Sequence, residues 1–424
     1  MRRAWVPVAA AFALCVGRAE ARRGSRSEHE AVRAIDRPPP AAAFVDPCLD
    51  GSACKRHALD GYYKALAATE TGSAAHPARI SWIGDSLTAD DQITDQVRRR
   101  LQARFGDGGP GFVYAVPPHP FCTHRAVRRA SGGDWDVHGV STEVPRDRLL
   151  GLGGGDATTD DGWLRFATIA NATAWSAADV FYLAEPHGGA IDVRTDTGAK
   201  ATIATAATAK APGFASAPLA GASRVDLRTR GHVRLFGVAL EAATGAVVDN
   251  LGVVNATAFS FARIRADHWQ AELAHRAPDL VVIMLGTNEA GWLPSSGKPI
   301  DDHERIVEGL LTTVRAANPA ASCLVISPLD QLAWERDGAP PRTSVPALVA
   351  AQQKAALAHG CAFWDTYAWM GGKGASRTWY RDKLMTNDFQ HPTTAGAHRI
   401  GDAVTAGLLD GYAAFRTRQR SAGL

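Results

Sequence analysis

The chain has 424 residues, of which 46% are hydrophobic and 21% charged, and its formal net charge is +3 at pH 7. This length exceeds that of one typical domain and predicts two. The near balance of charge, with basic residues scattered along the chain, argues against a nucleic-acid-binding protein. The composition is that of an ordinary soluble globular protein.

The first 21 residues have the pattern of a secretory signal peptide. Two arginines precede an apolar stretch over residues 4–17, and Ala19-Glu20-Ala21 matches an A-x-A cleavage site. The apolar stretch is shorter than the roughly 20 residues that a membrane-spanning helix needs. No other segment is predicted to span a membrane. We therefore expect an exported protein, periplasmic or secreted, that is cleaved near Ala21.

Residues 22–54 are rich in Arg, Ala and Pro and show no apolar periodicity, which predicts a disordered or extended linker. Cys48 and Cys54 lie near its end and could close a short disulfide loop in an oxidising compartment. The globular pattern starts at about residue 55.

Five short apolar runs predict buried parallel strands, at residues 80–83, 247–254, 280–285, 323–327 and 361–364. Helical patterns follow them, at residues 92–105, 259–276, 303–317, 345–359 and 394–415. Strands that alternate with helices predict the α/β class. We expect a three-layer α/β/α domain with a parallel sheet, built from residues 55–124 and 246–424.

One connection breaks this alternation. Between the first helix and the second strand lie about 140 residues, far more than a normal αβ loop contains. Period-two stretches such as residues 163–170 are separated there by Gly- and Asp-rich turns, which predicts an inserted antiparallel β-sandwich, jelly-roll-like, over residues 125–245. Trp135, Trp163 and Trp175 could stack on sugar rings, but the pattern favours each of them as a core residue.

Two further cysteines, Cys323 and Cys361, each begin a predicted strand, so they could either form a disulfide or be buried as small apolar residues. The five cysteines after the signal are an odd number, which leaves at least one thiol free or in an intermolecular bond. His119, Cys122 and His124 are close in sequence, but no second ligand cluster accompanies them. We therefore predict a polar loop and no metal site there.

A serine follows the first predicted strand on a glycine-containing turn, Gly84-Asp85-Ser86-Leu87. Late in the chain stands Asp388-Phe389-Gln390-His391. An acyl-transfer site needs a serine nucleophile, a histidine base, and an aspartate that fixes the tautomer of the histidine. The turn differs from the nucleophile elbow of α/β-hydrolases, because Thr88 takes the place of the second glycine.

Four polar residues follow strand ends of the predicted sheet. Ser86, Asn255 and Asn288 follow the first three strands, and His391 comes after the fifth. The carboxyl ends of parallel strands share one rim, where ligand sites form. We predict Ser86, Asp388 and His391 as the catalytic residues, with the Ser86 N–H, Asn255 and Asn288 as oxyanion donors. The alternative role for Ser86 alone is a helix N-cap.

Nearby polar residues have simpler interpretations. Asp302-His303 is a competing acid–base pair, but its position at a predicted helix start indicates a solvated cap. His398 falls within the last helix and is predicted to be a surface or packing residue. Asp85 and Glu289 are predicted to hold the turn and to orient the Asn288 loop.

These blocks resemble those of the SGNH/GDSL hydrolase superfamily. Gly84-Asp85-Ser86-Leu87 resembles its first block, Gly286-Thr287-Asn288-Glu289 its third, and Asp388-Phe389-Gln390-His391 its last. The superfamily usually offers a glycine N–H after the second strand as a further oxyanion donor. Here Asn255 matches that position, with Gly252 earlier in the strand. The resemblance implies a serine mechanism that requires no metal or organic cofactor.

The triad sets the reaction class and leaves the acyl group open, because the superfamily includes esterases, lipases, thioesterases and carbohydrate deacetylases. The arrangement, with Gly286-Thr287-Asn288-Glu289-Ala290 and an insertion before the second block, is similar to that of bacterial peptidoglycan O-acetylesterases. The export signal and the insert, which looks like a carbohydrate-binding module, favour a sugar ester. This resemblance implies a secreted serine esterase that removes O-acetyl groups from peptidoglycan or another cell-wall glycan through an acyl-serine intermediate. The alternatives are a lipid or thioester hydrolase, a glycan O-acetyltransferase, or a noncatalytic glycan-binding protein. The chain has no long apolar lid, which argues against a lipase.

Overall fold

The structure is a computed structural model that describes residues 43–51, 54–169, 172–334 and 336–421. The predicted signal peptide and most of the predicted linker lie outside these residues. Within the described ranges, no helix is both long enough and apolar enough to cross a membrane. All described residues belong to one compact unit.

The predicted parallel strands lie together in one sheet. They are β2 (Ala78–Gly84), β14 (Ala246–Gly252), β15 (Leu280–Met284), β16 (Ser322–Ile326) and β17 (Ala362–Trp364). Their order across the sheet is β17-β16-β15-β2-β14, and each neighbouring pair is parallel. Nearly all their residues are buried, because helices cover both faces of the sheet.

An additional short strand, β1 (Phe44–Val45), pairs antiparallel with β17 at the edge of this sheet. It lies within the predicted linker, so the folded part of the chain starts before residue 55. Phe44 packs against the core residues on this side of the sheet. Two residues are too few to show a periodic pattern, which is why the sequence did not predict this strand.

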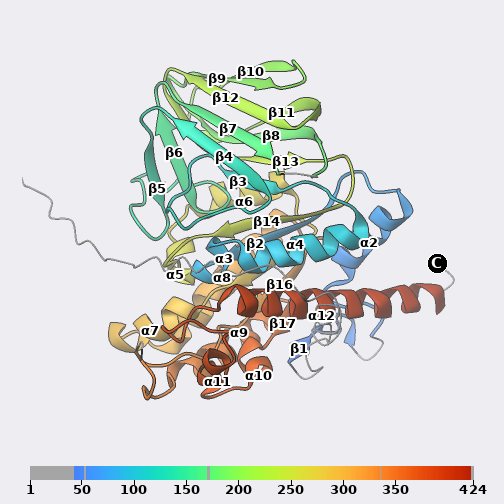
Figure 1. Cartoon of the computed structure of the whole chain (residues 1–424), viewed down its shortest axis with the longest axis vertical. Helices are drawn as coiled ribbons and strands as arrows, with labels where there is room; N and C mark the ends of the chain where they lie inside the picture. Colours follow the sequence, from blue (N-terminus) through green and yellow to red (C-terminus); the bar gives the residue numbers. More distant parts are fainter. Residues whose placement is uncertain (1–42, 52–53, 170–171, 335, 422–424) are drawn as a thin grey trace, which may run out of the picture. The chain divides into compact units, whose positions relative to one another are not determined.

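Alternate residues of the strands point to opposite faces. Val282 of β15 contributes to one hydrophobic core and Val281 to the other. On the first face lie α2 (Asp60–Thr71), α4 (Gln92–Phe105) and α12 (Thr394–Ser421). On the second face lie α6 (Ala266–Arg276), α8 (Ile300–Ala317) and α9 (Ser344–Ala358). Figure 1 shows α4 and α12 running side by side.

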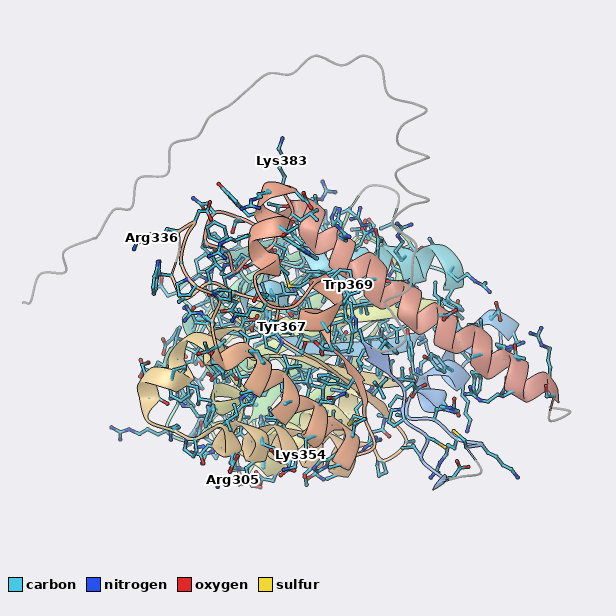
Figure 2. The ribbon with its side chains drawn as sticks, turned by 90° about the horizontal axis from the view of Figure 1, so that it is seen from below. Arg305, Arg336, Lys354, Tyr367, Trp369 and Lys383 are labelled. Carbon is cyan, nitrogen blue, oxygen red and sulfur yellow. A yellow bond between two sulfur atoms is a disulfide. The ribbon has the colours of Figure 1, made fainter. Side chains whose placement is uncertain are left out.

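The outer sides of these helices are charged. Figure 2 shows Arg305 of α8 and Lys354 of α9 at the rim of the molecule, and their side chains are 70% and 73% exposed. The predicted helix at 259–276 is divided into α5 (Ala258–Phe261) and α6, because Arg265 between them is extended.

Antiparallel strands occupy the long connection between α4 and β14. They are β3 (Gly111–Tyr114), β4 (Val127–Gly132), β5 (Asp136–Gly139), β6 (Gly155–Thr159), β7 (Trp163–Thr168), β8 (Trp175–Ala184), β9 (Ala190–Thr195), β10 (Lys200–Ala204), β11 (Ala211–Ala222), β12 (Arg224–Arg230) and β13 (Val233–Glu241). Among the described residues they form two sheets, ordered β10-β9-β12-β7-β4 and β11-β8-β13-β6-β5. β3 pairs with β13 and packs against β14, which connects this region with the parallel sheet (Figure 1).

Side chains from both antiparallel sheets share a hydrophobic core, as Phe166 of β7 and Val180 of β8 illustrate. Trp175 lies in this core, and Trp135 packs against it. Trp163 does not, and its prediction as a core residue is wrong, because 43% of this side chain is exposed. The alternation along β7 directs Leu164 and Phe166 inward and Trp163 to the outer face.

Among the described residues, two cysteines form a disulfide and three have free thiols. Cys323 of β16 and Cys361, just before β17, form a buried disulfide with an S–S distance of 2.01 Å. Cys48, Cys54 and Cys122 are free. The predicted possibility of a Cys48–Cys54 bond is therefore wrong for this structure, where the Cys48 thiol donates to Asp50 Oδ1 at 3.2 Å.

Candidate active site

Ser86 lies where β2 turns into the short helix α3 (Ser86–Ala89). Asp85 caps this helix, and its Oδ1 accepts a hydrogen bond from the Leu87 N–H at 3.0 Å. The turn requires glycine at position 84, because a Cβ there would lie 2.1 Å from Thr88 Oγ1. The chain thus places the Ser86 side chain at the carboxyl end of a buried central strand.

Asp388 and His391 lie in the loop that precedes α12. Phe389 between them has a φ of 55° and is 2% exposed, with its ring 4.7 Å from that of Tyr380. Asp388 Oδ1 accepts hydrogen bonds from Thr386 Oγ1 at 2.5 Å and from the His391 N–H at 2.9 Å. The buried phenyl ring and these hydrogen bonds fix the carboxylate in place before it meets the imidazole.

Ser86, His391 and Asp388 form a continuous chain of hydrogen bonds. Ser86 Oγ–H donates to His391 Nε2 at 2.8 Å, and His391 Nδ1–H donates to Asp388 Oδ2 at 2.7 Å. The hydrogen bond with Asp388 raises the pKa of His391, although burial opposes the effect. Burial alone would raise the pKa of Asp388, but the hydrogen bonds from His391 and Thr386 hold it well below its usual range. The arrangement suits a general base beside a nucleophile.

Asn255 adopts the backbone conformation that favours glycine, with a φ of 61°. Asparagine is one of the few other residues that tolerate this region. Among the hydrogen bonds of the described residues, neither the Asn255 N–H nor the Ser86 N–H has an acceptor. The Gly252 N–H, by contrast, donates to Asn250 Oδ1 at 3.0 Å. Asn255 is therefore the better candidate for the second oxyanion donor.

Asn288 lies in the first turn of α7 (Thr287–Ser296). Its Nδ2 donates to the Ala256 carbonyl at 2.8 Å, which leaves the second N–H of the amide for a ligand. The neighbouring Glu289 is buried, and its Oε1 accepts from the Ala258 N–H at 2.7 Å. Burial raises the pKa of Glu289 to about 7. Glu289 thus ties the Asn288 turn to α5, next to the Asn255 turn.

The competing pair does not reach the triad. His303 is fully buried, with Nδ1 3.6 Å from Glu289 Oε1, so its prediction as part of a solvated cap is wrong. The reason is helical spacing, since His303 lies one turn before the buried Val307 on the apolar stripe of α8. His398 is half-buried on α12. His124 is buried with Nδ1 3.7 Å from Asp91, and no group of three or more potential metal ligands occurs within the described ranges.

An open pocket of about 670 Å³ lies beside the loop that carries His391. It is lined by both oxyanion candidates, Asn255 and Asn288, and by Gln390, the neighbour of His391. Trp292 and Arg342 also line it. Neither Trp292 nor Arg342 could be selected from the sequence, because neither belongs to a motif and they come together only in the folded chain.

Comparisons with known proteins give one family match and one similar fold. The GDSL-like lipase/acylhydrolase family matches residues 219–399, a range that includes Asn288 and His391 but starts after Ser86. A solved peptidoglycan O-acetylesterase shares 24% sequence identity and a TM-score of 0.74, with 84% of this chain and 96% of that chain covered. No curated protein matches the chain.

Two further solved structures have much lower TM-scores. A catalytic mutant of an acetylxylan esterase from Geobacillus stearothermophilus shares 20% identity and a TM-score of 0.28, with 39% of this chain and 73% of that chain covered. A family two carbohydrate esterase from Cellvibrio japonicus shares 14% identity and a TM-score of 0.28, with 68% and 99% covered. The chain is thus similar to GDSL-like lipases and acylhydrolases over residues 219–399, and its fold is similar to that of the peptidoglycan O-acetylesterase.

Proposed function

We propose that this protein is a secreted serine esterase that removes O-acetyl groups from a cell-wall glycan, with peptidoglycan as the first candidate. The observation that carries the proposal is the hydrogen-bonded chain from Ser86 through His391 to Asp388. It adjoins a pocket lined by amide groups that can stabilise an oxyanion.

The reaction has two steps. Ser86 Oγ attacks the acetyl carbonyl carbon while His391 Nε2 takes the hydroxyl proton, and the Ser86 N–H, Asn255 N–H and Asn288 Nδ2–H stabilise the oxyanion. The bond to the sugar oxygen then breaks, His391 returns the proton to that oxygen, and an acetyl-serine remains. Water, deprotonated by His391, attacks the carbonyl carbon of this ester; the bond to Ser86 Oγ breaks, His391 returns the proton to Oγ, and acetate leaves. If a second sugar hydroxyl replaced water, the same site would transfer the acetyl group.

Two features favour a glycan ester over a lipid ester. The peptidoglycan O-acetylesterase resembles 84% of this chain, more than the parallel-sheet part alone can supply, so the likeness extends into the inserted strands. The pocket also presents Trp292, 40% exposed, as an apolar face suited to a sugar ring. The predicted signal peptide would bring the enzyme to such a substrate.

The insert is proposed to form the predicted sandwich and to hold the glycan chain. Trp163 lies on the outer face of the β10-β9-β12-β7-β4 sheet, next to Arg228 on the neighbouring strand. Seven basic side chains share this face: Arg128, Arg165, Arg194, Lys200, Arg224, Arg228 and Arg230. Only two acidic side chains, Asp192 and Asp226, oppose them on the same strands. An exposed indole among cations suits a polar sugar polymer.

The direct test is acetate release from O-acetylated peptidoglycan, with acetylated xylan in parallel. We expect release by the wild-type protein and its loss in Ser86→Ala and His391→Ala. His398→Ala is the matched control, because this half-buried histidine lies outside the site, and it should retain activity. Equal release by Ser86→Ala would sink the proposal. A fluorophosphonate probe that fails to label Ser86 would instead favour a noncatalytic glycan-binding protein.

A further inference from the structure

The pocket beside the triad is cationic. Two arginines, Arg263 and Arg342, line it, and its described lining contains no aspartate or glutamate. Arg263 is partly engaged, because its Nη1 donates to the Val140 carbonyl at 3.3 Å. Positive charge without a neighbouring carboxylate is unusual at a half-buried site, since a partly desolvated guanidinium is normally paired.

Of the two arginines, Arg342 has fewer polar partners for its side chain. Its side chain takes part in no ion pair within the described part of the chain, and its buried Nε has no hydrogen-bond partner there. Partial burial lowers the pKa of Arg342, and no nearby carboxylate offsets this effect. The group nevertheless stays protonated, because guanidinium does not lose its proton in proteins.

The orientation of this guanidinium is set by Gly291 on α7. Arg342 Cζ, Nη1 and Nη2 lie 3.4, 3.5 and 3.4 Å from the position that a Cβ at Gly291 would occupy. Nearly equal distances to these three atoms mean that the flat face of the group is turned toward Gly291. Its N–H groups lie in the plane of the guanidinium, so they point along the pocket instead of into α7.

The aromatic residues of the same pocket complete a plausible sugar subsite. The Trp292 and Phe259 rings meet edge to face, with centroids 5.2 Å apart. The Trp292 indole and the Arg342 guanidinium line the same pocket. Gln390 connects this end of the pocket with His391. A substrate whose ester lies at Ser86 would therefore extend its alcohol part toward these groups.

We propose that Arg342 binds a carboxylate on the alcohol part of the substrate, so that the enzyme prefers acetyl esters of acidic sugars to those of neutral sugars. This inference rests on the proposed esterase function. A guanidinium can donate two parallel N–H bonds to a carboxylate, which gives geometric selectivity as well as attraction. Hydrogen bonds to charged groups of this kind correspond to roughly 10- to 100-fold in kcat/KM.

The test compares 6-O-acetyl-N-acetylmuramic acid with its methyl ester. The two probes carry the same acetyl group on the same hydroxyl, and the lactyl group is a carboxylate in one and a neutral methyl ester in the other. The release of acetate is measured, so cleavage of the methyl ester does not contribute. We expect the wild-type enzyme to prefer the acid by roughly 10-fold or more. Arg342→Ala should lower kcat/KM for the acid by roughly 10- to 100-fold and change that for the methyl ester by less than about twofold.

Arg336→Ala is the matched control. This arginine belongs to the same connection between β16 and α9, but it is exposed and stacks on Trp334, with Cζ 5.7 Å from the ring centroid. Figure 2 shows Arg336 at the outside of the molecule. Its replacement should leave the acid-to-methyl-ester ratio unchanged. Arg342→Lys should retain part of the preference, because the charge remains while the paired N–H groups are lost.

Several results would overturn the inference. Equal losses on acid and methyl ester in Arg342→Ala would show a structural role, and unchanged kinetics on both would show no role. Hydrolysis of 4-nitrophenyl acetate separates the two proposals, since it depends on Ser86 and not on a carboxylate. If Ser86→Ala abolishes this hydrolysis while Arg342→Ala leaves the acid preference intact, only the Arg342 assignment fails. If the wild-type protein hydrolyses no ester, both proposals fail.

Discussion

Asp388 uses its two carboxylate oxygens differently. Oδ1 accepts hydrogen bonds from within its own loop, among them that of Thr386, and Oδ2 accepts the Nδ1–H of His391. The first set fixes the position of the carboxylate, and the second fixes the tautomer of the histidine so that Nε2 faces Ser86. Positioning and charge stabilisation therefore depend on one side chain.

The pH dependence of the reaction should report this contact. His391 must be neutral to accept the Ser86 proton, so kcat/KM falls as pH drops below the pKa of His391. Asp388 raises that pKa above its ordinary value of 6.5. We expect Asp388→Asn to move the acidic limb of the profile to lower pH while the plateau drops by about 10⁴-fold. Asp302→Asn, which replaces a carboxylate that pairs with the exposed Arg305 on α8, should change neither, and an unshifted limb in Asp388→Asn would contradict the assignment.

Side-chain and backbone donors to the oxyanion can be distinguished by substitution. Asn288→Ala removes an amide donor and should lower kcat by roughly 10²- to 10³-fold with little change in KM. Asn255→Gly keeps the backbone N–H and suits the φ of 61°, so it should retain most activity. A large loss of kcat in Asn255→Gly would show that the asparagine side chain itself contributes.

The catalytic residues could be selected from the sequence, because their residue types and short motifs indicate a reaction. Residues that matter only because the fold brings them to the site could not be selected. Ser86, Asp388 and His391 stand in short recognisable blocks, and the structure brings them into hydrogen-bond contact. Arg342 and Trp292 stand in no block. Their proximity depends on how the loop before α9 folds back on α7, and no local pattern encodes that.

Among the helices and strands, prediction succeeded where one buried face gives a long periodic pattern of apolar residues. The α4 helix has the predicted bounds because its apolar residues recur regularly along one face. β1 was missed because two residues carry no period, and His303 was misplaced because a helix start was equated with exposure. The alternation in β7 was visible, but the sequence did not show which of its two faces meets the second sheet.

The disulfide joins β16 to Cys361, just before the neighbouring strand β17, and should stabilise this edge of the parallel sheet. Its loop has a sequence separation of 38, and the chain-entropy estimate for such a loop is about 4 kcal/mol. We expect Cys323→Ser/Cys361→Ser to lose about that much free energy of unfolding, measured by denaturant titration. Cys54→Ser, which replaces an exposed free thiol, should lose almost none. Equal stability of the double variant and the wild-type protein would contradict this expectation.

On the scale of the molecule, the inserted strands are attached to the hydrolase through shared structure. β3 pairs with β13 and packs against β14, which ends just before the Asn255 turn. The period-two apolar pattern of the sequence indicated an insertion over residues 125–245. It could not show that β3, before that range, also belongs to the antiparallel sheets, because the pairing of β3 is made with a strand far along the chain.

If the insert binds the glycan chain and the triad cleaves the ester, a substitution in the insert should affect polymeric substrates and leave small esters unaffected. Trp163→Ala should lower activity on polymeric O-acetylated peptidoglycan by about 2- to 10-fold through KM, as expected for the loss of one stacking ring. Hydrolysis of 4-nitrophenyl acetate should be unchanged, because the small ester needs only the triad. Trp163→Phe should restore most of the polymer activity. Parallel losses on both substrates would show that Trp163 supports the fold and does not bind glycan.

The Ser86–His391 hydrogen bond joins residues that are 305 positions apart in the sequence. Contacts of such long range form late in folding, because the entropy of closing the intervening loop must be overcome first. While the chain is being synthesised, the nucleophile is present long before its base. A nascent or truncated chain that ends before His391 therefore carries an inert serine, however well its earlier strands have folded. Catalysis begins only when the loop that carries Asp388 and His391 packs beside Ser86. The rate at which activity appears during refolding therefore measures the rate at which the whole molecule folds.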